Sequence, residues 1–279
     1  MKALQISLLL FSSFGLTSFA EKSPFDSIDL VIESTAPEPT GKCSLGATLT
    51  LPKKNIKALA VLIHGSGSID RNGTIPGGFT TYKDIAEHLS SNGIAAIRFD
   101  KRSSLKTCAL KMNHSQFSYK VFIEDVKNVI RFAQGRSELN DTPTVLVGHS
   151  QGVNFGSEIA AGKSLRTDGL VLLAGLGKYA IDETIIRQLK GHLQNPNLPE
   201  ETRKQYEKLV ADGEVFFQRV RSGNYQEQDF FMGAYAPFWD EYISFTESGS
   251  LLAKQAQLPT LVLQGADDTN VTREDFDAL

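Results

Sequence analysis

The sequence predicts an α/β fold with a largely parallel sheet and helices on both faces, and three observations support this. Short unbroken apolar runs such as Ala58–Ile63 suit strands that are buried on both faces. Amphipathic stretches such as Phe117–Gln134 separate these runs and suit covering helices. Reactive polar residues directly follow three of the runs, and parallel sheets collect such groups at the carboxyl ends of their strands. These residues are His64, Asp100 and Ser150.

The first half of the chain alternates between the two kinds of element. Two opening strands are expected over Phe25–Ile32 and Ser44–Leu51, and the buried strand Ala58–Ile63 follows. Thr81–Ser91 places its apolar residues on one side and stops before Gly93, which is typical of a helix. The apolar run Ile94–Phe99 is the next strand.

The second half continues the alternation and then breaks it. A strand is expected from Thr144 to the glycine of a Gly-x-Ser-x-Gly pattern, with a helix over Val153–Gly162 and a strand over Gly169–Leu173. The sheet resumes at Leu258–Leu263, and a helix begins near Thr272. Strands joined through helices predict right-handed crossovers and a mostly parallel sheet.

The pattern Gly148-His149-Ser150-Gln151-Gly152 lies where a strand turns into a helix, which is the context of a nucleophile elbow. A serine hydroxyl becomes a useful nucleophile when it is held in a cleft beside a base. The tight turn needs glycines for close packing, and the following helix directs free N–H groups at a developing oxyanion. The alternative is a chance match in a loop.

Composition excludes several functional classes. The chain has 279 residues, is 41% hydrophobic and carries a net charge of −3 from 29 basic and 32 acidic residues. It can bury a large core and has no basic footprint for nucleic acid. The histidines are scattered and show no metal-ligand spacing, so we expect neither a metal nor an organic cofactor. The sequence leaves the oligomeric state open.

The N-terminal stretch predicts export. Lys2, the apolar run Ile6–Leu16 and the small-residue site ending at Ala20 are typical of a signal peptide over residues 1–20. We therefore expect a periplasmic or secreted protein without a stable membrane anchor, because the apolar run is short for a bilayer. Cys43 and Cys108 form a disulfide in one interpretation and remain two buried thiols in the other.

Four motifs carry a resemblance to a known family: His64-Gly65-Ser66-Gly67 with Asp70-Arg71, Arg98–Arg102, Gly148–Gly152 and Leu263–Asp268. Together they resemble the α/β-hydrolase superfamily, and most closely its exported bacterial esterases of the dienelactone-hydrolase-like group. The resemblance implies that Ser150 is the nucleophile, that the N–H groups of Ser66 and Gln151 form the oxyanion hole, and that Asp268 is the acid, with Asp267 as the second candidate. It also implies that His64, Gly65, Gly67 and His149 shape the binding site, with both rings packed away from the Ser150 oxygen.

A helical cap is expected over residues 176–257, inserted between core segments 21–175 and 258–279. The alternation stops there, and aromatic residues accumulate. One interpretation is that they line an apolar pocket for an acyl or alcohol group, and the other is that they only pack the cap onto the core. The aromatics in question are Phe216, Phe217, Phe230, Phe231, Tyr235, Phe238, Trp239 and Tyr242.

The expected function is hydrolysis of a small carboxylic ester through an acyl-enzyme, with one departure from the family. The triad order is serine, acid, histidine, yet no histidine follows His192. We do not expect His114 or His192 to be the base. The sequence therefore predicts a C-terminally truncated hydrolase that lacks its last strand and helix and has little activity as 279 residues. The alternatives are a non-catalytic product or pseudoenzyme that binds a small apolar ligand, and a serine peptidase or thioesterase of the same fold.

Overall fold

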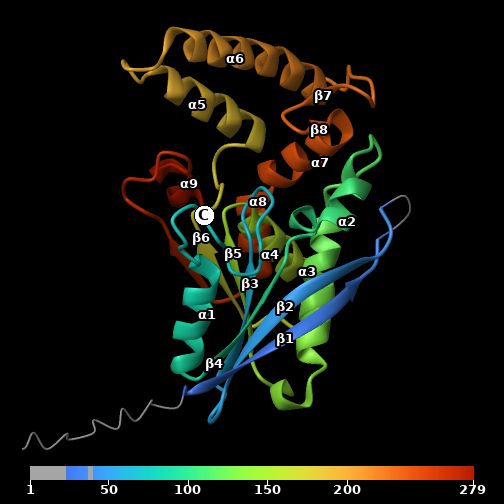
Figure 1. Cartoon of the computed structure of the whole chain (residues 1–279), viewed down its shortest axis with the longest axis vertical. Helices are drawn as coiled ribbons and strands as arrows, with labels where there is room; N and C mark the ends of the chain where they lie inside the picture. Colours follow the sequence, from blue (N-terminus) through green and yellow to red (C-terminus); the bar gives the residue numbers. More distant parts are fainter. Residues whose placement is uncertain (1–22, 37–39) are drawn as a thin grey trace, which may run out of the picture.

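The computed structural model describes residues 23–36 and 40–279, so the predicted signal peptide over residues 1–20 lies outside the described residues (Figure 1). A seven-stranded sheet with the order β1-β2-β4-β3-β5-β6-β9 forms its centre. β2 pairs antiparallel with β1 and β4, and the other pairs are parallel. The predicted mostly parallel α/β sheet is confirmed. Its strands are β1 (Phe25–Ser34), β2 (Cys43–Pro52), β3 (Ala58–Ile63), β4 (Ile94–Phe99), β5 (Thr144–His149), β6 (Gly169–Leu173) and β9 (Thr260–Leu263).

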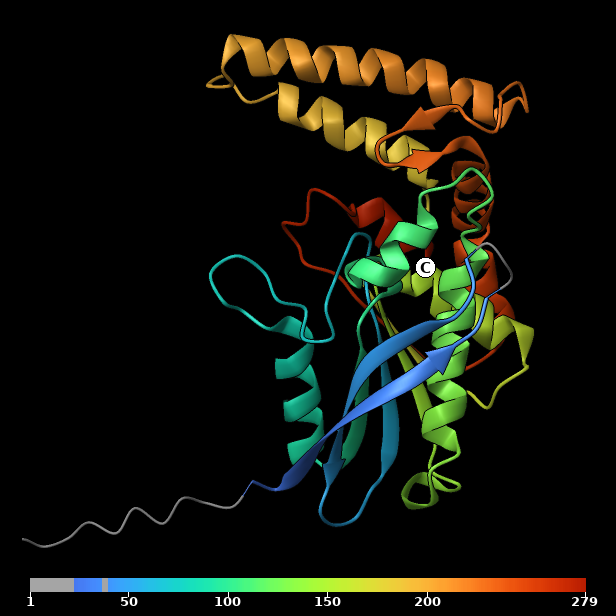
Figure 2. The same cartoon turned by 45° about the vertical axis from the view of Figure 1, so that its right-hand side comes forward.

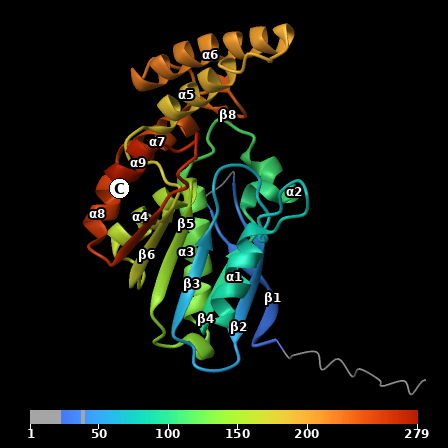
Figure 3. The same ribbon diagram turned by 90° about the vertical axis from the view of Figure 1, so that its left-hand side faces the viewer.

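Helices cover both faces of the sheet (Figure 3). α1 (Thr81–Ser91) packs on one face, and α3 (Lys120–Gln134) and α4 (Gln151–Gly162) pack on the other, where α8 (Gly249–Ala256) lies against α4. The burial of β3 on both faces explains why its sequence contains no polar residue. Alternate side chains, such as Val61 and Leu62, enter separate apolar clusters on the two faces, so every position from Leu59 to Ile63 is buried.

The carboxyl ends of the parallel strands meet at one edge of the sheet. Ile63 of β3 lies opposite Gly148 of β5, and His149 is in register with Leu173 of β6, which is in turn in register with Leu263 of β9. The loops that follow these strands therefore converge, as the sequence predicted for groups at strand ends. β9 pairs with β6 at the edge of the described sheet and leaves the Leu263 side chain exposed.

A cap lies over this edge of the sheet (Figures 1 and 2). It contains α5 (Ile181–Leu193), α6 (Glu200–Arg221), the two-stranded hairpin β7 (Phe230–Phe231) and β8 (Ala234–Tyr235), and α7 (Ala236–Glu247). The sequence reading missed the hairpin, which turns at Met232 and Gly233 with positive φ at both residues. α8, also within residues 176–257, packs on the core helix α4.

The segment between β4 and α3 is tied to the body of the protein twice. A disulfide joins Cys43 at the start of β2 to Cys108 in the short helix α2 (Lys106–Ala109), so the disulfide interpretation is correct. Arg102, in the 3₁₀ turn η1 (Arg102–Ser104), is fully buried and forms a two-pronged ion pair with Asp125 of α3. These ties fix the loop that continues through η2 (Leu110–Met112) to α3. The last helix, α9 (Arg273–Ala278), follows β9. Across residues 23–36 and 40–279, no helix has the length and apolar character to cross a membrane.

Candidate active site

Ser150 sits at a sharp, strained turn between β5 and α4. Its φ of 53° and ψ of −117° place a non-glycine residue in a sparsely populated region, which is typical of functional turns. The flanking glycines permit the turn. A Cβ on Gly148 would overlap the backbone of Gly152, and a Cβ on Gly152 would overlap the carbonyl of Ile63 in β3. The turn leaves Ser150 half-buried on the wall of a cavity of about 750 Å³.

Two backbone N–H groups beside Ser150 are free to bind an oxyanion. Within the described residues, neither the Ser66 N–H nor the Gln151 N–H makes a hydrogen bond, and both residues line the cavity with Ser150. Gln151 is the first residue of α4, so the positive end of the helix dipole lies at the same place. The Ser66 hydroxyl bonds with the Tyr242 hydroxyl of α7 at 3.2 Å, which ties the loop to the cap, and burial raises the pKa of Tyr242 to about 12.

Lys101 lines the same cavity and bonds with groups next to both donors. Its ammonium donates hydrogen bonds to the Gly65 carbonyl at 2.6 Å and to Gln151 Oε1 at 2.5 Å, and it rests 5.0 Å from the Phe122 ring centroid. The Gly65 carbonyl and the Ser66 N–H belong to the same peptide group. Lys101 is 4% exposed and forms no ion pair among the described residues, and burial lowers its pKa to about 7.

The two histidines of the site loops bond with groups other than the Ser150 hydroxyl. His64 is buried, and its Nε2 contacts the Phe99 carbonyl. Burial, and then the nearby charge of Lys101, lower the His64 pKa to about 3, so the ring is neutral. His149 Nδ1 bonds with the Tyr82 hydroxyl at 2.8 Å, and that hydroxyl also accepts the Gly65 N–H. Gly67 lines the cavity beside Ser66.

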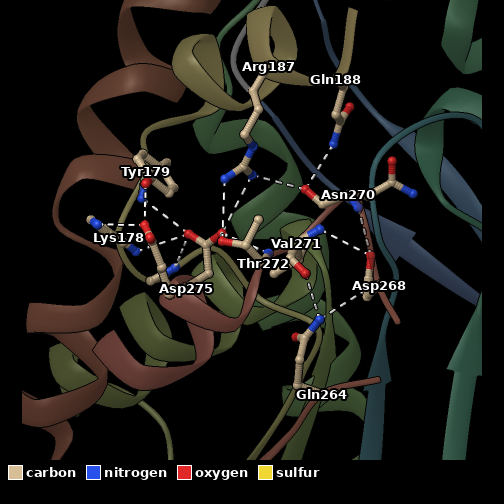
Figure 4. A network of polar contacts seen from close by, with 12 residues as sticks. Lys178, Tyr179, Arg187, Gln188, Gln264, Asp268, Asn270, Val271, Thr272 and Asp275 are labelled. Atoms are coloured by element: carbon tan, nitrogen blue, oxygen red, sulfur yellow. Dashed lines mark hydrogen bonds and ion pairs between the residues drawn. The ribbon is translucent and has the colours of Figure 1, made fainter. Parts of the chain in front are cut away.

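The Asp268 carboxylate is held in the loop after β9. Oδ1 accepts the N–H groups of Asn270 and Val271, and Oδ2 accepts from the Gln264 amide (Figure 4). Burial lowers the pKa of His149, and the negative charge of Asp268 opposes that shift. Asp267 is exposed, which fits its alternative role as a loop carboxylate.

The loop after β9, which carries Asp268, is held in place by the first residues of the cap (Figure 4). Asp275 is fully buried and accepts five hydrogen bonds, three from the N–H groups of residues 177–179 and two from Thr272. Arg187 and Gln188 of α5 both donate to the Asn270 carbonyl. Sequence reasoning did not single out Asp275, because only the fold shows that this carboxylate is buried. Lys101 could have been found from the sequence, because it follows a predicted strand within the Asp100-Lys101-Arg102 motif.

A catalytic base is not identified among the described residues. No described histidine bonds with Ser150 or Asp268; His192 stacks on Tyr206 in the cap, and His114 lines the cavity. No group of three or more His, Cys, Asp or Glu side chains in this part of the chain could hold a metal ion, and cofactor-free chemistry stays a prediction.

Comparison with known proteins assigns the family. The family described as serine aminopeptidase, S33 (Hydrolase_4) matches residues 55–279. The chain belongs to this family of α/β-hydrolases. The Thermotoga maritima esterase EstD is 28% identical over 266 residues, covering 95% of this chain and 57% of EstD, so the chain spans little more than half of that relative's length.

Solved structures show the same fold. A Pyrococcus furiosus esterase, Pf2001, superposes with a TM-score of 0.56 at 16% identity, covering 91% of this chain and 75% of its own. A thermostable carboxyl esterase from Bacillus coagulans gives 0.53 at 14% identity, covering 90% and 96%. The α/β-hydrolase fold expected from the motifs is therefore confirmed.

We predict that the Asp275→Asn variant is less stable by about 1–3 kcal/mol, because buried N–H groups lose a charged acceptor. Burial acts to raise the pKa of Asp275, but hydrogen bonds from Tyr179, Thr272 and Lys178 outweigh it and lower the pKa. The carboxylate therefore stabilises the fold above its ordinary pKa, and this contribution is lost as the pH falls through the lowered value.

Urea unfolding at pH 7 and at pH 3 measures both effects, and the Asn variant should show a smaller loss between them. The exposed Asp277, paired only with Arg273 on the surface, supplies the control variant Asp277→Asn. Equal stability of both variants would contradict the clamp.

Proposed function

We propose that this protein hydrolyses carboxylic esters through an acyl-enzyme on Ser150. The observation that carries the proposal is the strained presentation of Ser150 to a cavity beside the two free N–H groups. Ser150 Oγ attacks the ester carbonyl carbon and gives its proton to the base, while the carbonyl oxygen becomes an oxyanion that accepts from Ser66 and Gln151. The alcohol leaves with that proton, and water releases the acid. The narrower resemblance to dienelactone-hydrolase-like esterases remains part of this proposal.

For the whole protein, we propose that the base is a histidine after Asp268 in the order serine, acid, histidine. Asp268 would orient that imidazole through its own fixed carboxylate. Without it, the 279-residue chain should retain only the weak rate that the oxyanion hole and substrate binding provide.

The lining of the cavity suits an ester substrate better than the N-terminus of a peptide, which an aminopeptidase would bind. An aminopeptidase must hold the ammonium of the N-terminus, and a carboxylate is the usual partner of a buried cation. None of the described residues that line the cavity is Asp or Glu, and the lining includes the cation Lys101. The aromatic residues Tyr235, Phe238, Trp239 and Tyr242 line it as well, which supports an apolar acyl or alcohol group.

The first prediction concerns the nucleophile. The 279-residue protein should cleave p-nitrophenyl butyrate slowly, and added imidazole should raise the rate, because it supplies the base in solution. The Ser150→Ala variant should lose both rates above the background measured with imidazole alone. Equal rates for the two proteins, or cleavage of leucine p-nitroanilide in place of the ester, would contradict the proposal.

The second prediction concerns Lys101, which we expect to strengthen the oxyanion hole. An ammonium bonded to the Gly65 carbonyl polarises the peptide group whose N–H is the Ser66 donor. The ammonium is present below its lowered pKa of about 7 and is lost as the pH rises through that value, so the Ser150-dependent rate should decline there.

The Lys101→Met variant should lower kcat about tenfold with little change in KM and should lack this decline, since the charge acts mainly on the oxyanion. Lys101→Arg should move the decline to higher pH. Lys178→Met removes an exposed cation and serves as the control. An unchanged pH profile in Lys101→Met would show that Lys101 only supports the structure.

We also propose that the protein is exported and cut after Ala20. The sequence features of residues 1–20 and the Cys43–Cys108 disulfide support this, because disulfides persist in oxidising compartments. Mass spectrometry of the exported fraction of a bacterial host should find Glu21 at the N-terminus. An intact Met1 in that fraction would contradict the cleavage.

A further inference from the structure

Ser66 lies in the exposed part of the loop after β3, between contacts that hold its neighbours. The Gly65 N–H bonds to the Tyr82 hydroxyl at 3.2 Å, and the Gly67 carbonyl accepts the Ser103 hydroxyl at 3.0 Å. A Cβ placed on Gly67 would meet no other atom within 4 Å, so close packing does not restrain this part of the loop. The direction of the Ser66 N–H therefore depends on the contacts that Ser66 and its neighbours make.

The side chain of Ser66 is bonded to the cap. Within the described chain, the only hydrogen bond of Ser66 joins its hydroxyl to the Tyr242 hydroxyl of α7, at 3.2 Å. Both residues line the cavity that also contains Ser150. One side-chain contact thus connects the cap to the residue that supplies a free N–H to the proposed oxyanion hole.

Tyr242 is held firmly by its neighbours in the aromatic cluster. Its side chain is buried, and its ring stacks on Tyr119 with centroids 4.4 Å apart and an angle of 22° between the planes. Trp239 stacks on the same ring at 12°, and the Trp239 indole N–H donates to the Phe231 carbonyl at 2.9 Å. Packing therefore sets the position of the Tyr242 hydroxyl before any substrate binds.

The Tyr242 hydroxyl is neutral at physiological pH. Burial raises its pKa to about 12, so the group keeps its proton. A neutral hydroxyl can donate and accept, and so can the Ser66 hydroxyl, which means that their contact is a hydrogen bond in either direction. Phenylalanine at position 242 would keep the stacked ring and remove only this bond.

We propose that Tyr242 is a positioning residue for the reaction: its hydroxyl holds the Ser66 side chain and thereby keeps the Ser66 N–H directed at the oxyanion. This inference rests on the proposed ester hydrolysis and adds a residue of the cap to it. An oxyanion hole is effective when its donors already point to the place where charge develops. A donor on an exposed loop needs such a contact, because a small displacement lowers the rate.

Steady-state hydrolysis of p-nitrophenyl butyrate with added imidazole tests the effect on turnover. Tyr242→Phe should lower kcat about tenfold with little change in KM, because the ring still lines the cavity and the bond acts on the oxyanion donor. Ser66→Ala keeps the N–H and should lower kcat by a similar factor. Tyr225→Phe removes a hydroxyl that bonds with Asp240 of α7 outside the cavity, and this control should keep kcat.

The double variant Tyr242→Phe/Ser66→Ala separates positioning from general damage to the cap. If Tyr242 acts through the Ser66 hydroxyl, the double variant should lose no more kcat than either single variant, because both changes break the same bond. A loss equal to the product of the two single losses would mean that Tyr242 acts independently of Ser66, which would overturn the inference.

Calorimetric binding to the Ser150→Ala protein gives a second readout that needs no turnover. The monoethyl ester of butylphosphonic acid is a tetrahedral anion that resembles the transition state, and ethyl pentanoate is the matching neutral ester. Adding Tyr242→Phe should weaken binding of the phosphonate about tenfold and leave binding of the ester unchanged. Equal weakening of both ligands would show a change in cavity shape and would contradict positioning.

The outcomes separate the two proposals. If hydrolysis depends on Ser150 but both single variants keep the parent kcat, the positioning role is wrong while ester hydrolysis stands. If turnover is too slow to measure, the comparison of the phosphonate with the ester decides the role of Tyr242. If no Ser150-dependent hydrolysis occurs and neither ligand binds, the proposed function fails and the positioning role fails with it.

Discussion

The close approach of α4 to β3 and β5 is the constraint on which the site depends. Gly148 and Gly152 let the backbone of the elbow touch itself and the end of β3, with no room for a Cβ at either position. The strained Ser150 turn follows from this contact, because the chain must reverse within one residue to start a helix there. The same contact brings the first N–H of α4 beside the loop after β3, so one packing contact positions Ser150 and both free N–H groups.

Asp268, the proposed acid, is positioned by different contacts, which involve the cap. Residues 177–179 begin the cap, and their N–H groups converge on Asp275, while Arg187 and Gln188 of α5 hold the Asn270 carbonyl. Asn270 in turn donates to Asp268. The cap therefore both covers the cavity and fixes the loop that carries the acid. A displacement of α5 would disturb the Asp268 carboxylate as well as substrate access.

Local patterns predicted the parts of the fold that local physics determines. Ala58–Ile63, Thr81–Ser91 and Ile94–Phe99 were predicted with their observed bounds, because period and glycine stops define them. The long helix begins at Lys120 and not at Phe117, and the nearby backbone is held by Glu241 of α7, which accepts from the Tyr119 N–H. Such a contact joins residues far apart in sequence, so no local pattern contains it.

The site, like the fold, combines features that local sequence patterns predict with features that only tertiary packing determines. The elbow, the His-Gly-x-Gly loop and Asp268 follow strand ends and were found from motifs, whereas the clamp at Asp275 and the place of His114 in the cavity depend on tertiary packing. The disulfide was predicted only in part from the sequence. The sequence could show that Cys43 and Cys108 were available, and only the structure shows that β2 and α2 bring them together.

Lys101 shows how the electrostatics of the site fit the proposed acyl transfer. Burying an ammonium without a carboxylate destabilises the charged form, and its lowered pKa is the measure of that cost. Its acceptors are neutral: a peptide carbonyl and the Gln151 amide. A carboxylate at this position would neutralise the ammonium before any substrate bound. In the proposed mechanism, the uncompensated charge is instead available to the oxyanion, which would form at the other end of the same peptide group. The field is therefore in place before that reaction begins.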